Sequence, residues 1–473
     1  MSETPPVRQR PVPTSASYAI TVRLYADPAP AVVGVIATAV GVAGGVVTAI
    51  DVSESRHDRI TIDVTCSAAD GDHAQEIVHA LESIDGVSVY RVSDRTFLLH
   101  LGGKISVQSK VPLKTRDDLS MAYTPGVGRV SLAIAAKPED VTRLTIKGNT
   151  VAVVTDGSAV LGLGNIGPGA ALPVMEGKAA LFKRFADIDA WPICLDTQDV
   201  DEIVATVRHI SPGFGGINLE DISAPRCFEI ERRLRAELDI PVFHDDQHGT
   251  AIVVLAALTN ALRCVGKVMS ATRVVVAGGG AAGTAVVDLM LAAGLQQVLV
   301  WDREGILAPD DDRLVGAKHA LAQRTNPDAR HGDLHDALRG ADVFVGVSAP
   351  NILPAEWIAD MAADPVVFAL ANPDPEVDVD AARAYAAILA TGRSDYPNQI
   401  NNVLAFPGVF RGLLDARAHE VTTPMLLQAA DALAHCVSDE QLNASYIVPS
   451  VFDPAVPTAV ADAVRAASPQ PPR

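Results

Sequence analysis

Two pairs of acidic residues follow short apolar segments that are typical of buried strands. Glu220 and Asp221 form the first pair, and Asp245 and Asp246 form the second. Because ligands bind beyond the carboxyl ends of the strands in an open α/β sheet, we expect the two pairs to surround one hard cation. Oxygen ligands alone suit Mg²⁺ or Mn²⁺ rather than zinc. The sequence therefore predicts a divalent-metal site.

Two alternatives stay open for these acids. Neighbouring side chains on a strand point in opposite directions, so one member of each pair lies outside the ligand set unless the chain turns there. One aspartate of the second pair could instead cap the helix predicted to begin near Gly249. His244 and His248 have the spacing of a zinc pair on a helix, but Gly249 separates them from that helix, which favours loop residues.

A third group of residues centres on Lys178, within the segment PVMEGKA. Lys178 lies near the start of a mostly apolar helix predicted over residues 172–185, where a lysine is unusual. A nearby divalent cation disfavours the ammonium form of a lysine, so its pKa falls toward the range in which a base works. Lys178 is therefore a candidate general base, and the alternative is a lysine on the protein surface.

A glycine-rich turn follows an apolar strand and opens a helix in the second half of the chain. Gly278 allows the tight turn, Gly280 lets the backbone approach a pyrophosphate, and Gly283 lets the helix pack against the strand. The amides at the start of this helix, where Ala281 and Ala282 lie, would hold the phosphates. Strand, glycines and helix together predict a dinucleotide-binding site.

The next predicted strand carries the residues that would choose the cofactor. Asp302 ends this strand, where an acid accepts hydrogen bonds from the ribose hydroxyls and favours NAD. Arg303 follows it and could instead meet the 2′-phosphate of NADP, so NADP is the alternative. A second GxGxxG match, at residues 162–167, is followed directly by Pro168. We expect that match to form a tight loop beside the substrate rather than a second dinucleotide site.

The elements that position these residues alternate between strand and helix patterns from residue 104 onward. Residues 104–246 have the pattern of an α/β domain with a mostly parallel sheet. Residues 247–440 have that of a doubly wound, Rossmann-type domain. Residues 18–97 have the order βαββαβ, a split ferredoxin-like unit. The predicted fold class is α/β: a Rossmann-type nucleotide-binding domain and a substrate and metal domain, preceded by a small ferredoxin-like domain.

One uncharged stretch, residues 31–50, is long enough to span a bilayer. Gly44 and Gly45 interrupt it with a dipeptide that is typical of turns, and β-branched residues follow them. The pattern therefore predicts a helix followed by a buried strand rather than a membrane span.

Composition and charge argue against several classes of protein. The net charge is −19 and aromatic residues make up 4%, which disfavour binding to nucleic acid or to an anionic membrane. The five cysteines include no CxxC pair, which argues against a disulfide framework and favours the cytoplasm. Residues 1–17 have no apolar core of a secretory signal and are predicted to form a flexible tail.

Eight motifs, in order over residues 105–415, resemble those of malic enzymes. They are MAYTPGV (121–127), VTDGSAVLGLGNIG (154–167), PVMEGKA (173–179), NLEDI (218–222), VFHDDQHGTA (242–251), VVVAGGGAAGTA (274–285), ALANPDPE (369–376) and NNVLAFPGVF (401–410). The resemblance implies an NAD-dependent, decarboxylating malate dehydrogenase. Such an enzyme converts L-malate to pyruvate and CO₂ with NAD or NADP and Mg²⁺ or Mn²⁺, and also decarboxylates oxaloacetate as a partial reaction.

The resemblance also implies roles for the polar residues named above. Glu220, Asp221 and Asp246 would bind the metal. Lys178 would take the hydroxyl proton of malate, and Asp245 would lie beside the metal and assist Lys178.

Further roles follow from the resemblance, together with one departure from it. Tyr123 would protonate C3 of the enol, and Asn372 and Asn402 would contact the substrate and the nicotinamide.

Many large-subunit malic enzymes have an arginine just before LGLG, where this chain has Ala159. The residue that holds a substrate carboxylate is therefore left unidentified, and the chain is similar in this respect to shorter bacterial malic enzymes.

The N-terminal unit resembles an ACT domain in topology, length and its strand–Asp–Pro–helix entry. We expect it to bind a small-molecule effector, and the alternative is a dimerisation module without a ligand. The whole chain is expected to form a homodimer or homotetramer. The expected organisation is a flexible tail (1–17), an ACT-like regulatory domain (18–100), a substrate and metal domain (101–246), an NAD-binding Rossmann domain (247–440) and a C-terminal helical segment and tail (441–473).

Two other functions stay open at this point. A malolactic-type lyase would keep the nicotinamide bound and release lactate and CO₂. A regulatory protein with an inactive catalytic half is the other alternative, against which the intact tyrosine, lysine and acid set argues.

Overall fold

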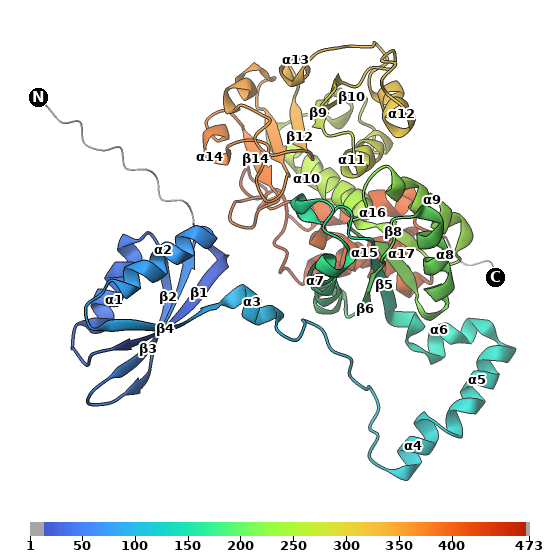
Figure 1. The fold of residues 1–473 in the computed structure, drawn as a ribbon. Coiled ribbons are helices and arrows are strands. Elements are labelled where there is room, and N and C mark those ends of the chain that lie inside the picture. The colour runs from blue at the N-terminus through green and yellow to red at the C-terminus, as the bar shows by residue number, and fades with distance from the viewer. Residues whose placement is uncertain (1–13, 470–473) are drawn as a thin grey trace, which may run out of the picture. The chain divides into compact units, whose positions relative to one another are not determined.

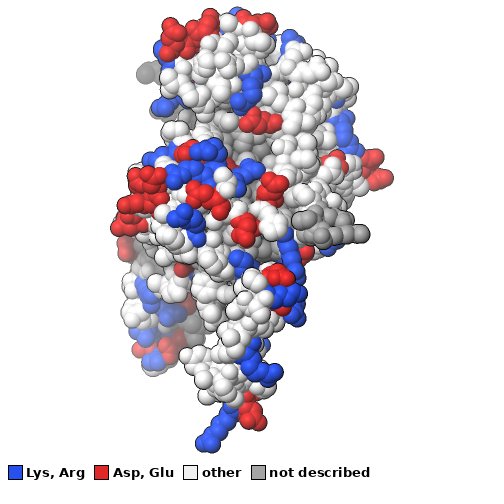
Figure 2. All heavy atoms as spheres, turned by 90° about the vertical axis from the view of Figure 1, so that its right-hand side faces the viewer, with Lys and Arg blue, Asp and Glu red and all other residues white. Residues whose placement is uncertain are grey.

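The computed structural model describes residues 14–469, and the chain divides into two compact units at Ser106 and Val107 (Figure 1). Figure 2 shows acidic and basic side chains interspersed over one face of the protein. The negative net charge is therefore not gathered into a single acidic patch on that face.

The first unit contains one antiparallel sheet and two helices that pack against it. Its elements are β1 (Ser15–Ala26), α1 (Val32–Val42), β2 (Val46–Ser55), β3 (Ile60–Ala68), α2 (Gly71–Glu82) and β4 (Val87–Asp94), with sheet order β2-β3-β1-β4. Alternate residues of β1, such as Val22 and Leu24, pack with Ile36 of α1 and Ile77 of α2. The predicted βαββαβ order is present, and α3 (Arg95–His100) follows it.

The N-terminal boundary differs from the prediction. Strand β1 begins at Ser15, which pairs with Ala68 of β3, so residues 15–17 belong to the strand instead of a tail. The remainder of the predicted tail, residues 1–13, lies outside the described residues.

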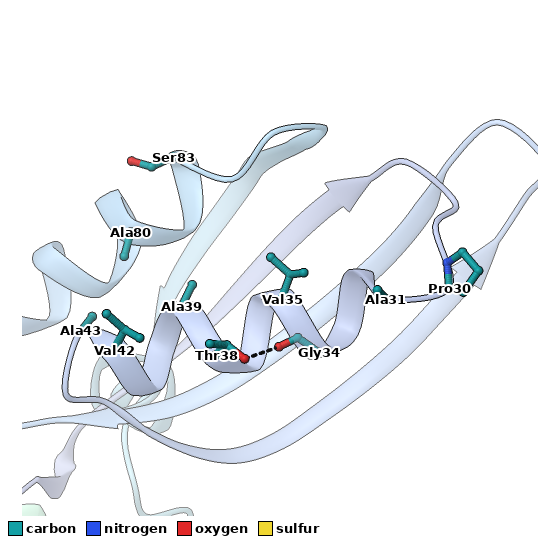
Figure 3. A pocket seen from close by; sticks show the side chains of 10 residues that line it. All are labelled: Pro30, Ala31, Gly34, Val35, Thr38, Ala39, Val42, Ala43, Ala80 and Ser83. Atoms are coloured by element: carbon teal, nitrogen blue, oxygen red, sulfur yellow. Dashed lines mark hydrogen bonds between the residues drawn. The ribbon is translucent and has the colours of Figure 1, made fainter.

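The uncharged stretch 31–50 folds as predicted, into α1 and the start of β2, with Gly44 (φ +89°) in the turn between them. A shallow groove runs along α1 and the end of α2 (Figure 3). Its lining is almost entirely small or apolar: Pro30, Ala31, Gly34, Val35, Thr38, Ala39, Val42, Ala43, Ala80 and Ser83. The Thr38 hydroxyl donates to the carbonyl oxygen of Gly34 and so adds little polarity to the groove.

The second unit begins with three short helices, α4 (Arg116–Ala122), α5 (Gly126–Ala136) and α6 (Val141–Leu144). None of their residues is buried. Helix α4 begins with a capping box in which the Thr115 hydroxyl and the Asp118 carboxylate each accept from the backbone.

A four-stranded parallel sheet follows, with strand order β6-β5-β7-β8. Its strands are β5 (Thr150–Thr155), β6 (Asp189–Cys194), β7 (Gly216–Leu219) and β8 (Val242–His244), and its helices are α7 (Pro168–Ala186), α8 (Val200–Ile210) and α9 (Arg226–Glu237). Helix α7 begins four residues before the predicted start, because Gly167 turns the chain with φ +83° and Pro168 suits the first helical position.

The second sheet of this unit has six strands in the order β11-β10-β9-β12-β13-β14. All pairings are parallel except that of the short β11. The strands are β9 (Arg273–Ala277), β10 (Gln297–Asp302), β11 (Gly305–Ile306), β12 (Val343–Gly346), β13 (Val366–Ala369) and β14 (Ile388–Thr391). The order reverses beside β9, and such a switch point is where doubly wound sheets bind ligands. Strands β11 and β14 were not predicted.

Helices surround this sheet and join it to the smaller one. They are α10 (Thr250–Val265), α11 (Ala281–Ala292), α12 (Gly316–Thr325), α13 (Leu334–Leu338), α14 (Val379–Ala382), α15 (Phe406–Ala416), α16 (Thr423–His435) and α17 (Ala455–Ala467). Phe406 and Phe410 of α15 pack edge-on against Phe182 of α7, so both halves share one core. The stretch Asp245–Val265 is long and apolar enough to cross a membrane, but it is mostly buried inside the protein as a core helix.

Candidate active site

The two acidic pairs meet at one edge of the smaller sheet. Glu220 and Asp221 follow β7, and Asp245 and Asp246 follow β8, its neighbour in the sheet. One carboxylate oxygen from each of Glu220, Asp221 and Asp246 lies within 4.8 Å of the others. The backbone amide of Asp221 also donates to Asp246 Oδ2 at 2.9 Å, which links the two loops.

The backbone explains how adjacent acids reach the same place. Asp221 has φ +54°, so the chain turns immediately after β7 and strand alternation no longer separates it from Glu220. Asp245 and Asp246 lie in a single π-helical turn, Asp245–Gly249, that leads from β8 into α10. Such turns are frequent at functional sites.

The cluster fits a divalent cation. Asp221 Oδ2 is buried and has no hydrogen-bond partner among the described residues, which is costly for a carboxylate unless a cation binds it. Burial, followed by the charge of Asp246, raises the pKa of Asp221 to about 7. Burial also raises the pKa of Glu220 well above its ordinary value. Glu220, Asp221 and Asp246 are therefore the residues that would hold Mg²⁺ or Mn²⁺.

Lys178 of α7 projects into this acidic cluster. Its Nζ lies 2.6 Å from Asp245 Oδ2 and 2.9 Å from Glu220 Oε1, and 4.3 Å from the centre of the Phe406 ring. Its side chain is only 9% exposed, so the surface-lysine alternative does not describe this structure. Burial lowers the pKa of Lys178, but the charges of Asp245 and Glu220 outweigh burial and hold that pKa above its ordinary value.

Asp245 is fixed by its neighbours rather than by the metal cluster. It is fully buried, and its Oδ2 accepts from Lys178 Nζ and, at 2.5 Å, from Asn402 Nδ2. A Cβ at Gly249 would lie 1.9 Å from Asp245 Oδ1, so only glycine leaves room for this carboxylate. Burial raises the pKa of Asp245 to about 6.

Two groups near the cluster were missed by the sequence analysis. Asn218 Nδ2 donates to Glu220 Oε2 at 2.8 Å, and its position on the predicted strand two residues before Glu220 could have revealed this. Buried Glu231 of α9 accepts from His248 Nε2 at 2.6 Å and from Gln247 Nε2 at 3.2 Å, which anchors the π-helical turn. The sequence offered no signal for Glu231, because the pairing joins two distant segments.

The histidines differ from the loop prediction. His244 is the last residue of β8 and is fully buried, and His248 lies within the π-helical turn. The chain therefore passes from strand to helix without a loop.

Tyr123 is not brought to the cluster by its own chain. It directly follows α4 and is 67% exposed. No contact between it and Lys178 or the acids is found among the described residues. The role of Tyr123 in protonating C3 therefore stays a prediction, and within one chain this residue is exposed.

Asn372 lies beside the loop of the second GxGxxG match. A Cβ on Gly162 would lie 2.3 Å from the Asn372 carbonyl oxygen, so the loop and Asn372 pack closely. Asn372 is exposed, and the peptide bond that joins it to Pro373 is cis.

The glycine turn after β9 has the geometry that the sequence suggests. Gly278 has φ +120°, and a Cβ on Gly283 would lie 1.8 Å from the Gly278 carbonyl oxygen. No atom lies within 4 Å of a Cβ placed on Gly280, which leaves the backbone open to a ligand. Ala281 and Ala282 are the first residues of α11, so their amides lie at the N-terminal end of that helix, next to Gly280.

Asp302 ends β10 and is held by a lysine that the sequence analysis missed. Lys318 Nζ of α12 lies 2.8 Å from Asp302 Oδ2 and 3.2 Å from Glu304 Oε2, while Arg303 is exposed. Burial raises the pKa of Asp302, but the hydrogen bond from Lys318 outweighs it and holds that pKa below its ordinary value. Asp302 is therefore ionised and ready to accept from ribose hydroxyls.

Comparison with known families decides the relationship of this chain. Residues 102–235 match the malic enzyme N-terminal domain, and residues 247–467 match the malic enzyme NAD-binding domain. The chain belongs to the malic enzyme family. It therefore carries an NAD-binding domain of this family, as the glycine turn and the six-stranded sheet indicate.

Individual relatives agree with this assignment. An NAD-dependent malic enzyme of Geobacillus stearothermophilus is 56% identical over 453 residues, which cover 96% of this chain and 95% of the relative. A bifunctional malic/malolactic enzyme of Bacillus subtilis is 52% identical over 77% of this chain and 90% of the relative. The crystal structure of an NAD-dependent malic enzyme of Thermotoga maritima, 51% identical, matches with a TM-score of 0.76 over 79% of this chain and 99% of its own.

Proposed function

We propose that this malic enzyme oxidises and decarboxylates L-malate to pyruvate and CO₂ with NAD. The observation that carries the proposal is the buried Lys178 between Asp245 and Glu220, set against a three-carboxylate cluster. A malate hydroxyl needs a base, and its neighbouring carboxylate needs a cation. This cluster offers both groups at the same sheet edge.

The chain's own residues have distinct tasks in this proposal. A bound Mg²⁺ or Mn²⁺ would supply Lewis-acid polarisation of the substrate oxygens. The charges of Asp245 and Glu220 raise the pKa of Lys178, and the opposing charge of a bound cation would lower it, so that Lys178 could take the hydroxyl proton of malate. Bound NAD would accept the hydride from C2. Asp245 accepts from the Lys178 amine and balances the positive charge that the amine gains, while Asn402 donates to the same carboxylate oxygen and orients it. Asn372 contacts the substrate and the nicotinamide.

The remaining proton must reach C3 after CO₂ has left, and we assign this step to Tyr123. Because Tyr123 is exposed in its own chain, we propose that it enters the site of a second copy in a homodimer or homotetramer. Further apolar side chains of the same segment are exposed and would be covered by that copy: Leu119 (54%), Met121 (68%) and Leu132 (74%). Exposed apolar side chains gathered on one segment are typical of an interface.

The test of the proposed function is reduced-nicotinamide absorbance of metal-stripped protein after malate, Mn²⁺ and NAD are added. We expect NADH and pyruvate in equal amounts, only with the metal. NADPH from NADP alone would keep the reaction class and contradict the cofactor assignment to Asp302. Absence of product with either cofactor, in the full-length chain, would contradict the proposal.

A second product deserves measurement in the same assay. The Bacillus subtilis relative is named a bifunctional malic/malolactic enzyme and is 52% identical. Lactate formed from malate without free NADH would assign the malolactic reaction to this chain as well.

We also propose that residues 18–100 form an ACT-like regulatory domain that binds a small effector, beside a substrate and metal domain (101–246) and a Rossmann domain (247–440). The apolar groove along α1 supports a ligand or partner there. Deletion of residues 1–106 should remove the response of malate oxidation to amino acids. An unchanged response would contradict the regulatory role.

All five cysteines are free thiols, which supports our placing of the enzyme in the cytoplasm.

A further inference from the structure

The loop after β5 has no positively charged side chain at the position where many large-subunit malic enzymes have an arginine. Ala159 occupies it, and its amide donates to the Asp221 carbonyl oxygen at 2.9 Å. Beside it, the amide of Ser223 donates to Ser158 Oγ at 2.9 Å. These bonds join the loop after β5 to the loop that carries the metal-binding acids. A methyl group there cannot bind a substrate carboxylate.

An arginine from the next helix reaches this junction instead. Arg226 is the first residue of α9, and its Nη2 donates to Asp156 Oδ2 at 2.9 Å. Asp156 is fully buried and is itself fixed by the amide of Ser158 at 3.0 Å and its hydroxyl at 2.5 Å. The guanidinium is therefore oriented by a carboxylate that is rigidly held.

Arg226 has donors that its own chain does not use. Asp156 is its recorded hydrogen-bond partner among the described residues, and its Nε is buried without any acceptor. Its side chain is 30% exposed, so a ligand has access to one end of the guanidinium. The planar fork of an arginine binds a carboxylate with two parallel hydrogen bonds.

The charge of the site requires such a group. Glu220, Asp221, Asp245 and Asp246 face one ammonium group, that of Lys178. A divalent cation would still leave this group of side chains negative. A substrate with two carboxylates therefore needs a further positive group, and Arg226 lies at the same sheet edge, between the ends of β5 and β7.

We propose that Arg226 binds the malate carboxylate that is retained in pyruvate. The other carboxylate leaves as neutral CO₂, so a guanidinium bound to it would stabilise the substrate more than the transition state. The retained carboxylate keeps its charge throughout and gains from a permanent cation. This inference rests on the proposed oxidation of malate and names the residue that replaces the arginine missing at Ala159.

The test uses oxalate, which presents a carboxylate beside a chelating oxygen as malate does. Arg226→Gln and Arg226→Lys enzymes, loaded with Mn²⁺, are titrated with oxalate by calorimetry and compared with wild type. We expect about 10- to 100-fold weaker oxalate binding in Arg226→Gln, because charge-assisted hydrogen bonds are lost. The KM for malate should rise similarly. Arg232→Gln is the matched control, because Arg232 lies on the same helix and pairs with exposed Glu229.

Binding of Mn²⁺ and NADH without oxalate separates a substrate contact from a structural effect. Both affinities should stay unchanged in the Arg226 variants, and adding Ala159→Arg to Arg226→Gln should recover part of the oxalate affinity. Unchanged oxalate binding in Arg226→Gln would overturn the inference, as would an equal loss of Mn²⁺ binding. The titration needs no turnover, so a wild-type enzyme inactive toward malate would contradict the proposed function separately. If the Arg226→Gln chain fails to fold, the Arg226→Lys chain replaces it in the titration, because lysine keeps a positive charge beside buried Asp156.

Discussion

At the scale of single residues, the site is an excess of buried carboxylates around one lysine. Asp221 has a pKa of about 7 in the folded chain against an ordinary value of 3.8, and burial is the main cause. The folded state therefore binds more protons than the unfolded state between these values. The free energy of unfolding of the metal-free protein should accordingly fall as pH rises from about 4 to about 7.

The same proton competes with the metal. We expect the affinity for Mn²⁺ to fall about tenfold per pH unit below 7 for one displaced proton, because metal ligands must be deprotonated. Titration of metal-stripped enzyme with Mn²⁺ between pH 5.5 and 8 measures this slope. An affinity that is constant over this range would contradict the assignment of Asp221 as a ligand.

Replacement of Lys178 tests the base directly. Lys178→Ala should lower kcat for malate oxidation by about 10²- to 10⁴-fold, the usual contribution of a positioned base. Lys183→Ala is a suitable control on the same helix, since Lys183 pairs with Asp187 and Asp189 at the surface. Stopped-flow absorbance after mixing with malate and NAD reports the loss. Full activity of the Lys178→Ala enzyme would refute the role.

At the scale of elements, the π-helical turn Asp245–Gly249 decides where the second acidic pair points. Its five residues bring Asp245 against Lys178 and Asp246 toward Glu220, and buried Glu231 of α9 accepts hydrogen bonds from two other residues of the turn. A regular helical start would rotate these side chains relative to each other. The turn is thus the element that separates Asp245, the partner of Lys178, from Asp246, the proposed metal ligand.

Gly249→Ala should disturb this turn without unfolding the chain. A Cβ there would overlap Asp245 Oδ1, and the carboxylate must move away from Lys178. We expect kcat to fall at least about tenfold while the melting temperature changes little, since misplacement by 1 Å is costly in catalysis. Gly213→Ala, where the Cβ would meet nothing within 4 Å, is the control. A fully active Gly249→Ala enzyme would show that the position of Asp245 is unimportant.

At the scale of the whole molecule, the residues proposed for catalysis lie in parts of the chain between which no contact is found among residues 14–469. Lys178 and the acids share a buried edge, whereas Tyr123 belongs to helices without a buried residue. In a symmetric dimer each copy would supply the tyrosine of its partner's site.

Mixing two inactive variants tests this arrangement. Tyr123→Phe and Lys178→Ala chains, co-expressed or reassociated, should recover about a quarter of wild-type activity, because half of randomly formed dimers contain one intact site. Malate oxidation of the mixture, with each variant alone as control, is the measurement. No recovery in a mixture shown to contain mixed dimers would place Tyr123 in its own chain's site.

The sequence by itself determined the strands that carry the site and the kinds of residue at their ends. Period-two and apolar patterns are local, so they predict the apolar strands β7 and β9 and the glycine turn that leads into α11. The motifs placed Lys178 and the acids on separate segments whose closeness follows from parallel strands ending at one edge.

Only the tertiary structure decided which of these residues touch. The left-handed backbone at Asp221, the π-helical turn after β8 and the pairing of Lys318 with Asp302 each depend on contacts between distant segments. The same holds for Arg226 beside Asp156, and for Tyr123, which its own chain leaves exposed. Local patterns record which face of an element is buried, but not which charged group lies opposite it, because that depends on how the chain folds back on itself.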